Sequence, residues 1–446
     1  MSWRGRPWAW AVHYQDHAAV DTAVARLREL PPLVTSGEIE RLRTLIADAQ
    51  QGKRFVLQGG DCAETLAECT SASITSKLKI LLQMSMSLTF ASKRPVVRIG
   101  RWAGQYAKPR SSGMETRKID GESISLPSYF GDLVNRAEFT PEARRADPAL
   151  MIEGYKHSAL TLNFVRSLME AGLGDVHHPE RWELGFLSRA GLSTETRERY
   201  QRLMGRIGEG IRFLEAISER EIDALSRGEF FASHEALNLY YEEAQTREVP
   251  RRTGWWNLTT HLPWVGERTR ALDGPHVEYL RGIRNPIGVK LGPSSTVEQV
   301  VAIIRTLNPT GEAGKIVLIA RLGASNVRRM LPTLIQGARL AGSPVLWVCD
   351  PMHGNLMTTG TGIKTRDFAH VMDELLTSWD VHAECGSHLG GIHIELTGDD
   401  VTECLGGAAN LTEQDLTKRY QTLCDPRLNY EQSMELAMAL AERMER

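Results

Sequence analysis

Cationic and hydroxyl side chains are concentrated in residues 100–111, which read GRWAGQYAKPRS. The segment follows an apolar, β-branched run at 96–99, a pattern that predicts a buried strand. A proline between Lys108 and Arg110 keeps the backbone extended and so fixes the directions of both cations. A guanidinium fork, an ammonium group and the Ser111 hydroxyl at a strand end suit a phosphorylated small molecule. Taken alone, the same loop is compatible with a solvated basic surface.

Further cations follow other apolar runs of the chain. If these runs are strands of one parallel sheet, six cationic side chains converge at one edge: Arg101, Lys108, Arg110, Arg268, Lys290 and Arg321. Such a group repels itself unless anions are bound. Each phosphoryl group carries roughly −1.5 to −2 charges, so two phosphates and a carboxylate would offset most of the charge of the six cations. The pattern predicts a site for a highly anionic pair of reactants.

A second set of residues has the chemistry of metal ligands. Cys62, His353, Glu395 and Asp425 each lie at or just after a predicted strand end or in the last loop. Mixed sulfur, nitrogen and oxygen donors differ from closed structural zinc sites and suit a divalent transition metal used as a Lewis acid. The wide separation of the four residues is weak evidence by itself, and a histidine that merely caps its loop is the alternative.

Apolar runs alternate with amphipathic patterns along most of the chain, which predicts βα units and a parallel sheet. Three of the amphipathic stretches, 297–307, 327–340 and 368–379, have helical spacing. We therefore expect an α/β fold, a (β/α)8 TIM barrel, with its chemistry at the carboxyl ends of the strands. The expected strands are Phe55–Leu57, Val96–Ile99, Phe230–Ala232, Trp256–Thr260, Ile287–Val289, Ile316–Ile319, Val345–Val348 and Gly391–Ile394.

Two regions exceed a minimal barrel. Residues 1–50 form an N-terminal extension with a helix at 38–50, ahead of a catalytic barrel over 51–446. Residues 113–228 form an insertion between the second and third strands, with helical stretches around 155–171 and 198–217. We expect the insertion to be an interface or allosteric element, and the chain to close with a helix at 431–446.

Composition excludes several classes of protein. The 446 residues carry a net charge of −2, which argues against general nucleic-acid binding. No signal peptide or apolar run of membrane-spanning length is visible, so we expect a cytoplasmic protein. The six cysteines form no CxxC pair, which argues against a zinc knuckle or a disulfide framework.

Eight ordered blocks resemble the class II (plant-like) 3-deoxy-D-arabino-heptulosonate 7-phosphate (DAHP) synthase family. The similarity extends from about Ser36 to the C-terminus. The blocks are LQGGDCAE (57–64), AGQYAKPRS (103–111), GERTR (266–270), NPIGVKLGP (285–293), CDPMHGN (349–355), HIELTG (393–398), TECLGG (402–407) and CDPRLN (424–429).

The resemblance implies a transferase that condenses phosphoenolpyruvate with D-erythrose 4-phosphate, the first step of the shikimate pathway. It implies that Cys62, His353, Glu395 and Asp425 bind manganese, with cobalt, iron or zinc as other occupants. Lys108, Arg110 and Ser111 match contacts to the aldose phosphate. The positions that match the phosphoenolpyruvate pocket are Arg101, Lys108, Glu267, Arg268, Lys290 and Arg321.

Catalytic roles follow from these matches as hypotheses. We expect the metal, held in part by His353, to polarise the aldehyde, and Lys108 to donate a proton to the new hydroxyl. Lys290 is expected to hold the departing phosphate with Arg268 and Arg321. Glu267 is the expected group that orients the attacking water.

The resemblance leaves several alternatives open. The family uses the N-terminal arm in subunit contacts, so we expect residues 1–50 to make oligomer contacts, although the arm departs from the family pattern. We expect a homo-oligomer, either a dimer or a tetramer. Some relatives partner a chorismate mutase. A paralogue of secondary metabolism, serving a phenazine or aminoshikimate pathway, is an alternative, and a non-catalytic regulatory scaffold is a weaker one because no matched position is lost. Cys424 precedes Asp425, so it either forms a reversible disulfide with Cys62 or is an inert buried thiol.

Overall fold

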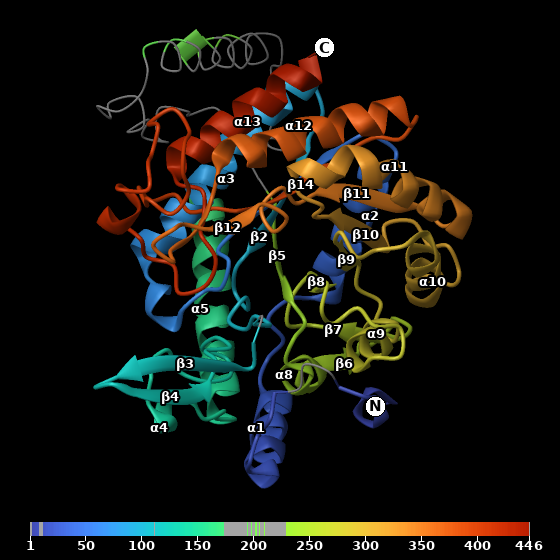
Figure 1. The fold of residues 1–446 in the computed structure, drawn as a ribbon. Coiled ribbons are helices and arrows are strands. Elements are labelled where there is room, and N and C mark those ends of the chain that lie inside the picture. Colours follow the sequence, from blue (N-terminus) through green and yellow to red (C-terminus); the bar gives the residue numbers. More distant parts are fainter. Residues whose placement is uncertain are drawn as a thin grey trace.

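Eight parallel strands close into a barrel at the centre of the molecule (Figure 1). The structure, a computed structural model, describes residues 2–8, 12–110, 112–173 and 229–445, with isolated positions between 194 and 209. The strands follow the circular order β1-β14-β11-β10-β9-β8-β5-β2. The expected (β/α)8 fold is therefore confirmed. The strand bounds are Phe55–Gly60 (β1), Val96–Arg101 (β2), Phe230–Glu235 (β5), Leu262–Val265 (β8), Ile287–Leu291 (β9), Ile316–Ala320 (β10), Val345–Cys349 (β11) and Gly391–Glu395 (β14).

The fourth barrel strand was predicted in the wrong place. It is β8, Leu262–Val265, whereas the expected strand at 256–260 contributes only to β7, Trp255–Asn257. That segment pairs antiparallel with β6, Thr246–Glu248, outside the barrel. β8 contains Pro263, and a proline argues against a central strand because it cannot donate to the ladder. The aromatic, β-branched run just before it therefore looked like the better strand.

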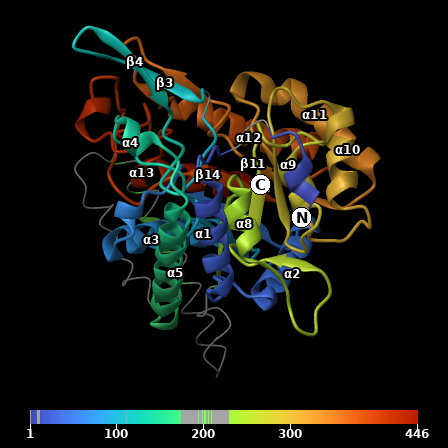
Figure 2. The same ribbon diagram turned by 90° about the horizontal axis from the view of Figure 1, so that it is seen from below.

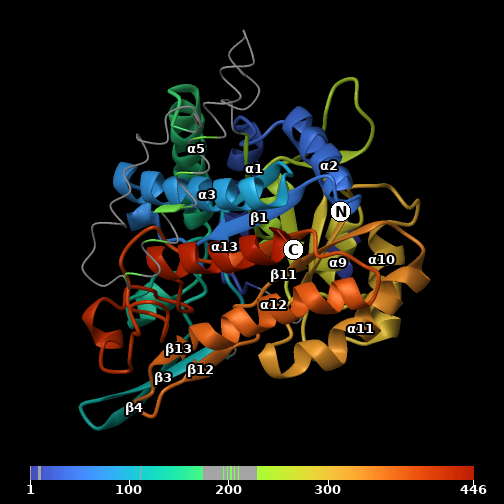
Figure 3. The ribbon, with the colours of Figure 1, turned by 90° about the horizontal axis from the view of Figure 1, so that it is seen from above.

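Helices cover the outside of the barrel, and several of them pack side by side (Figure 3). The prediction at 297–307 is confirmed residue for residue by α10, which starts at a Thr296 capping box. The expected helices at 327–340, 368–379 and 431–446 are parts of longer or slightly shifted helices. The helix bounds are Ser71–Ser92 (α3), Leu239–Ala244 (α8), Pro275–Leu280 (α9), Val297–Leu307 (α10), Ala324–Ala341 (α11), Phe368–Glu384 (α12) and Tyr430–Glu445 (α13).

The N-terminal extension closes one end of the barrel. Its second helix, α2 (Ser36–Gln50), packs Leu42, Leu45 and Ile46 into one apolar cluster with side chains from β1, β2, β5, β8, β10 and β11. The amino ends of the strands are thereby sealed, which leaves the carboxyl ends for a site.

The rest of the extension folds against its own chain. It consists of the short turn η1 (Ser2–Gly5) and helix α1 (His17–Glu29), and the sequence pattern had predicted neither element. The Trp3 indole donates a hydrogen bond of 3.0 Å to Glu243 of α8. The expected contacts of this arm with other subunits stay a prediction.

The insertion between β2 and β5 begins with a β-hairpin that projects from the body of the protein (Figure 2). The hairpin strands are Met114–Ile119 (β3) and Glu122–Pro127 (β4), followed by Pro141–Arg144 (α4) and Ala149–Glu170 (α5). The helix expected around 155–171 corresponds to α5, which begins earlier and ends one residue sooner. The stretch expected at 198–217 lies almost wholly outside the described residues.

A second hairpin and two short turns complete the described fold. The hairpin strands are Leu356–Thr358 (β12) and Lys364–Arg366 (β13), and the turns are Leu66–Glu68 (η2) and Leu416–Lys418 (η4). None of the helices in the described part of the chain has the length and hydropathy that a membrane span needs.

Candidate active site and metal centre

Three of the predicted metal ligands meet at the open end of the barrel. The Cys62 sulfur and one carboxylate oxygen each of Glu395 and Asp425 lie within 4.8 Å of one another, and all three residues are buried. Cys62 follows β1 and Glu395 ends β14, and these strands pair so that Gly60 lies opposite Glu395. Asp425 arrives on the loop before α13. Strand pairing therefore joins residues that are more than 300 positions apart in the sequence.

His353 adjoins this cluster. Its Nε2 lies 2.9 Å from the Glu395 carboxylate, and its Nδ1 lies 2.7 Å from Oδ2 of Asp350. Asp350 is fully buried and also accepts a 3.2 Å hydrogen bond from the backbone N–H of His353. A carboxylate that holds Nδ1–H turns Nε2 toward a metal, which is the usual arrangement around metal-binding histidines.

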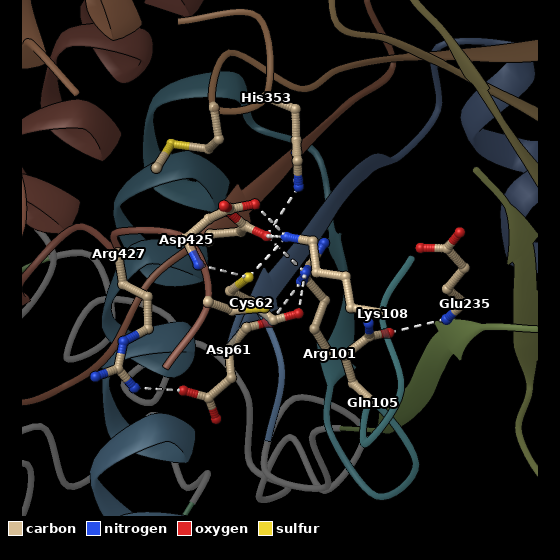
Figure 4. Close-up of polar contacts among 12 residues, drawn as sticks. Asp61, Cys62, Arg101, Gln105, Lys108, Glu235, His353, Asp425 and Arg427 are labelled. Atoms are coloured by element: carbon tan, nitrogen blue, oxygen red, sulfur yellow. Dashed lines mark hydrogen bonds and ion pairs between the residues drawn. The ribbon is translucent and has the colours of Figure 1, made fainter. Parts of the chain in front are cut away.

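The ammonium group of Lys108 lies among these donors (Figure 4). It is 2.5 Å from Oδ2 of Asp425, 2.7 Å from the Cys62 sulfur and 3.2 Å from Oε1 of Glu395. Burial disfavours the charged lysine, but the charge of Asp425 and of the other neighbours raises the pKa of Lys108 well above its usual value. The donor set thus holds a positive charge, and its thiol, imidazole and carboxylates fit a divalent transition metal.

Arg101 ties the same cluster to the first strand. Its guanidinium donates to Glu395 at 3.0 Å, to the Cys62 carbonyl at 3.1 Å and to the Asp61 carbonyl at 2.9 Å. It also lies over the ring of Trp264, 5.1 Å from the centroid. Arg101 is 1% exposed, so these contacts fix it at the floor of the site.

A cavity adjoins the donor cluster. Its volume is about 130 Å³, and it opens to solvent. The cavity brings together seven of the predicted residues and leaves Arg110 outside its lining. Its lining residues are Arg101, Gln105, Lys108, Pro109, Glu235, Trp264, Gly266, Glu267, Arg268, Lys290, Arg321 and His353.

The cations of the cavity are held by protein groups from several strand ends. The Lys290 ammonium forms an ion pair with Asp350, and burial lowers the pKa of Lys290 to about 8. Arg321 donates to the His353 carbonyl, and Arg268 donates to the Pro109 carbonyl at 3.3 Å. The cavity therefore presents preorganised positive charge, as an anionic reactant requires.

Glu267 lines the cavity with a carboxylate whose oxygens are already occupied. It accepts hydrogen bonds from the Gly292 N–H at 2.7 Å, the Ser294 hydroxyl at 2.5 Å and the Arg270 guanidinium at 3.0 Å. Burial opposes ionisation, yet Arg270 and Ser294 lower the pKa of Glu267. This geometry suits a residue that orders its loop.

Glu235 was not assigned a role from the sequence, although it ends β5 at the same edge of the barrel. The Glu235 side chain faces the cavity from the side opposite Lys108. The backbone N–H of Glu235 donates a 2.8 Å hydrogen bond to Gln105 (Figure 4). Within the described part of the chain its Oε1 has no hydrogen-bond partner. Burial raises the pKa of Glu235, against the opposing charges of Lys108 and Lys290. The signal that could have found it is its position at a strand end.

Two predicted residues lie at the margin of the site. Arg110 donates to the sulfur of Cys424 at 2.5 Å, whereas Ser111 lies outside the described residues. The thiols of Cys62 and Cys424 are in hydrogen-bond contact, and neither cysteine forms a disulfide in this structure. A hydrogen bond from Cys62 and the nearby cations lower the pKa of Cys424 to about 7, despite its burial.

Comparisons with known proteins agree on one family. The sequence model described as the Class-II DAHP synthetase family matches residues 1–441. Phospho-2-dehydro-3-deoxyheptonate aldolase from Neurospora crassa is 45% identical over 457 residues, covering 99% of this chain and 93% of that protein. The enzyme of that name from Streptomyces coelicolor is 44% identical, covering 99% and 96%. The Mycolicibacterium smegmatis enzyme is 43% identical, covering 93% and 88%.

Among solved structures, a truncated DAHP synthase from Thermotoga maritima aligns with 88% of this chain and 87% of its own, at a TM-score of 0.33 and 12% identity. So low a score carries no weight, and the fold assignment rests on the closed barrel itself.

Proposed function

Because the chain belongs to the class-II DAHP synthetase family, we propose that it condenses phosphoenolpyruvate with D-erythrose 4-phosphate and water. The products are 3-deoxy-D-arabino-heptulosonate 7-phosphate and phosphate, in the first step of the shikimate pathway. The observation that carries this proposal is the junction of two features at the open end of the barrel. A cavity lined with cations meets a buried set of metal donors there.

The family implies a divalent metal, and the donor set fits one. Cys62, His353, Glu395 and Asp425 would hold it, and we propose manganese, with cobalt, iron or zinc as alternatives. Bound there, the metal would supply Lewis-acid polarisation of the aldehyde oxygen of the aldose phosphate. Burial, together with Cys424 and Glu395, raises the pKa of Cys62 well above its usual value, so binding to this thiol would release a proton.

The cations of the cavity bind and orient phosphoenolpyruvate. Arg268, Lys290 and Arg321 hold its phosphate, and Arg101 and Lys108 lie on the side of the metal donors. Arg110 holds the aldose phosphate, with Ser111 as its neighbour in the sequence. This arrangement contributes mainly by positioning two anionic reactants and by stabilising their charge.

The condensation forms one carbon–carbon bond and one carbon–oxygen bond, the latter from water, and it breaks the carbon–oxygen bond to phosphate. The enol carbon of phosphoenolpyruvate attacks the aldehyde carbon, and Lys108 donates a proton to the oxygen that becomes the new hydroxyl. Water then adds to the oxocarbenium-like carbon, and phosphate leaves with cleavage of its carbon–oxygen bond.

We assign the proton of the attacking water to Glu235 rather than to Glu267, the group expected from the sequence. Glu235 has a carboxylate oxygen without a hydrogen-bond partner among the described residues, and burial raises its pKa toward the range of a general base. The oxygens of Glu267 are already committed to Gly292, Ser294 and Arg270. Glu267 instead orders the loop that carries Arg268.

The setting of the enzyme is proposed from the family. We expect a cytoplasmic homo-oligomer, a dimer or a tetramer, with the 113–228 insertion as an interface or allosteric element and a chorismate mutase as a candidate partner.

The test of the proposed function is a measurement of both substrates and of phosphate. Purified protein loaded with Mn²⁺ is mixed with phosphoenolpyruvate, and D-erythrose 4-phosphate is added afterwards. We expect phosphoenolpyruvate to disappear and phosphate to form in equal amounts, and only after the aldose is added. Phosphate release before the addition, or no consumption by folded, metal-loaded protein, would contradict the proposal.

A further inference from the structure

One buried arginine outside the barrel strands contacts three of the segments that carry metal ligands. Arg366 ends β13 and is fully buried. Its Nη2 donates to Oε2 of Glu395 at 2.7 Å, its Nε donates to the Met352 carbonyl at 2.8 Å, and its Nη1 donates to the Pro426 carbonyl. Each partner is therefore a proposed ligand or the neighbour of one, because Met352 precedes His353 and Pro426 follows Asp425.

The contact with Glu395 decides which carboxylate oxygen faces the donor set. Arg366 occupies Oε2. The other oxygen, Oε1, lies 2.9 Å from Nε2 of His353 and 3.2 Å from the Lys108 ammonium. The guanidinium thus fixes the rotation of Glu395 while it anchors the loops on either side.

An arginine is suited to this position and a lysine is not. The planar guanidinium donates in several fixed directions, whereas an ammonium is a compact point charge on a flexible stem. The two carbonyls and the carboxylate lie on three separate segments, so only a fork can contact all of them at once. Arg366 does not line the cavity. Its side chain donates its hydrogen bonds to the two carbonyls and to Glu395.

We propose that Arg366 is the positioning residue that assembles the metal centre, because it holds Glu395 and the loops of His353 and Asp425 in one arrangement. The inference rests on the metal site of the proposed function. Groups that orient metal ligands typically change metal affinity by roughly 10–100-fold when they are removed. We therefore expect Arg366→Lys to weaken Mn²⁺ binding by at least about tenfold.

Arg144 provides a matched control. It is 2% exposed and its guanidinium also ties loops together, through Glu115 at 2.7 Å and the carbonyls of Pro127 at 3.0 Å and Ala137 at 2.9 Å. These partners belong to the β3–β4 hairpin and the segment after it, and none of them adjoins a proposed metal ligand. Arg144→Lys therefore reproduces the loss of a buried fork without touching the metal centre.

The experiment measures Mn²⁺ dissociation constants by equilibrium dialysis for the wild type, Arg366→Lys and Arg144→Lys. We expect a loss of at least about tenfold for Arg366→Lys, less than about threefold for Arg144→Lys, and a matching rise in the Mn²⁺ concentration that half-activates the enzyme. The KM for phosphoenolpyruvate should change less than this activation constant. Equal Mn²⁺ affinity in the wild type and Arg366→Lys, or an equal loss in both variants, would overturn the proposal.

A measurement on the wild type decides the matter if Arg366→Lys does not fold. Amide hydrogen exchange of residues 356–367 is compared with and without Mn²⁺. We expect metal binding to slow exchange in this hairpin, which contains no ligand itself, and unchanged exchange would overturn the inference. A wild type that binds no Mn²⁺ would instead contradict the metal site of the proposed function, so the two failures are distinguishable.

Discussion

Replacing Lys108 by methionine should have opposite effects on metal binding and on turnover. In the structure the Lys108 ammonium contacts Asp425 at 2.5 Å, Cys62 at 2.7 Å and Glu395 at 3.2 Å. A divalent ion that binds these donors must displace this charge. Methionine keeps a similar length and removes the charge, so the variant should bind Mn²⁺ more tightly while it loses the proposed proton donor.

The magnitude follows from the contact that has no substitute. Glu395 keeps Arg101 at 3.0 Å and Arg366 at 2.7 Å when Lys108 is removed, whereas Asp425 keeps only the more distant Lys364, at 3.7 Å, among the described cations. A hydrogen bond to a charged group contributes about 1.5–3 kcal/mol. At about 1.4 kcal/mol for each factor of ten, Mn²⁺ affinity should rise roughly 10- to 150-fold. Turnover should fall by roughly 10²- to 10⁴-fold, the usual contribution of a general acid.

The assay is a titration of Mn²⁺ followed by the electron paramagnetic resonance signal of the free ion, combined with turnover at saturating Mn²⁺. Lys364→Met is the matched control, because this lysine is 40% exposed and lies 3.7 Å from the same aspartate. Solvent screening should limit its effect to less than about threefold. Unchanged or weaker Mn²⁺ binding in Lys108→Met would show that the lysine does not compete with the metal, and near-normal turnover would exclude Lys108 as the proton donor.

Three further predictions concern other residues of the site. His353→Ala should abolish metal-dependent turnover while the far-ultraviolet circular dichroism spectrum stays that of the wild type; retained activity would remove His353 from the ligand set. Glu235→Gln should lower kcat by roughly 10²- to 10⁴-fold with little change in the KM for phosphoenolpyruvate, whereas Glu267→Gln should mainly raise that KM; the reverse pattern would return the role of base to Glu267. Because burial lowers the pKa of Lys290 to about 8, the free enzyme loses this positive charge above that pH. The kcat/KM for phosphoenolpyruvate should therefore decline above pH 8 in the wild type, and a decline at the same pH in Lys290→Arg would exclude Lys290 as its cause.

The sequence was informative where local pattern and position at a strand end coincide. Apolar periodicity located most barrel strands and helix α10, and the strand-end rule brought Cys62, His353 and Glu395 to one edge. The sequence pattern did not predict β8, because Pro263 argues against a strand there. In the structure this segment nevertheless pairs with β5 as a barrel strand.

The missed site residues depend on tertiary contacts. A lone glutamate at a strand end, such as Glu235, shows its role only when Lys108 and Lys290 are placed around it. Arg366 has carbonyl partners on loops that are distant in the sequence, and no spacing rule relates an arginine to such groups. The roles of both residues therefore become apparent only in the three-dimensional structure.

The most direct test of the proposed metal-dependent condensation is whether phosphoenolpyruvate consumption depends on the metal. Consumption in the presence of D-erythrose 4-phosphate is followed by the loss of phosphoenolpyruvate absorbance, first without chelator, then with it, and then after Mn²⁺ is restored. We expect consumption to stop on chelation and to return with Mn²⁺. Consumption that continues in protein shown to be free of metal would contradict it.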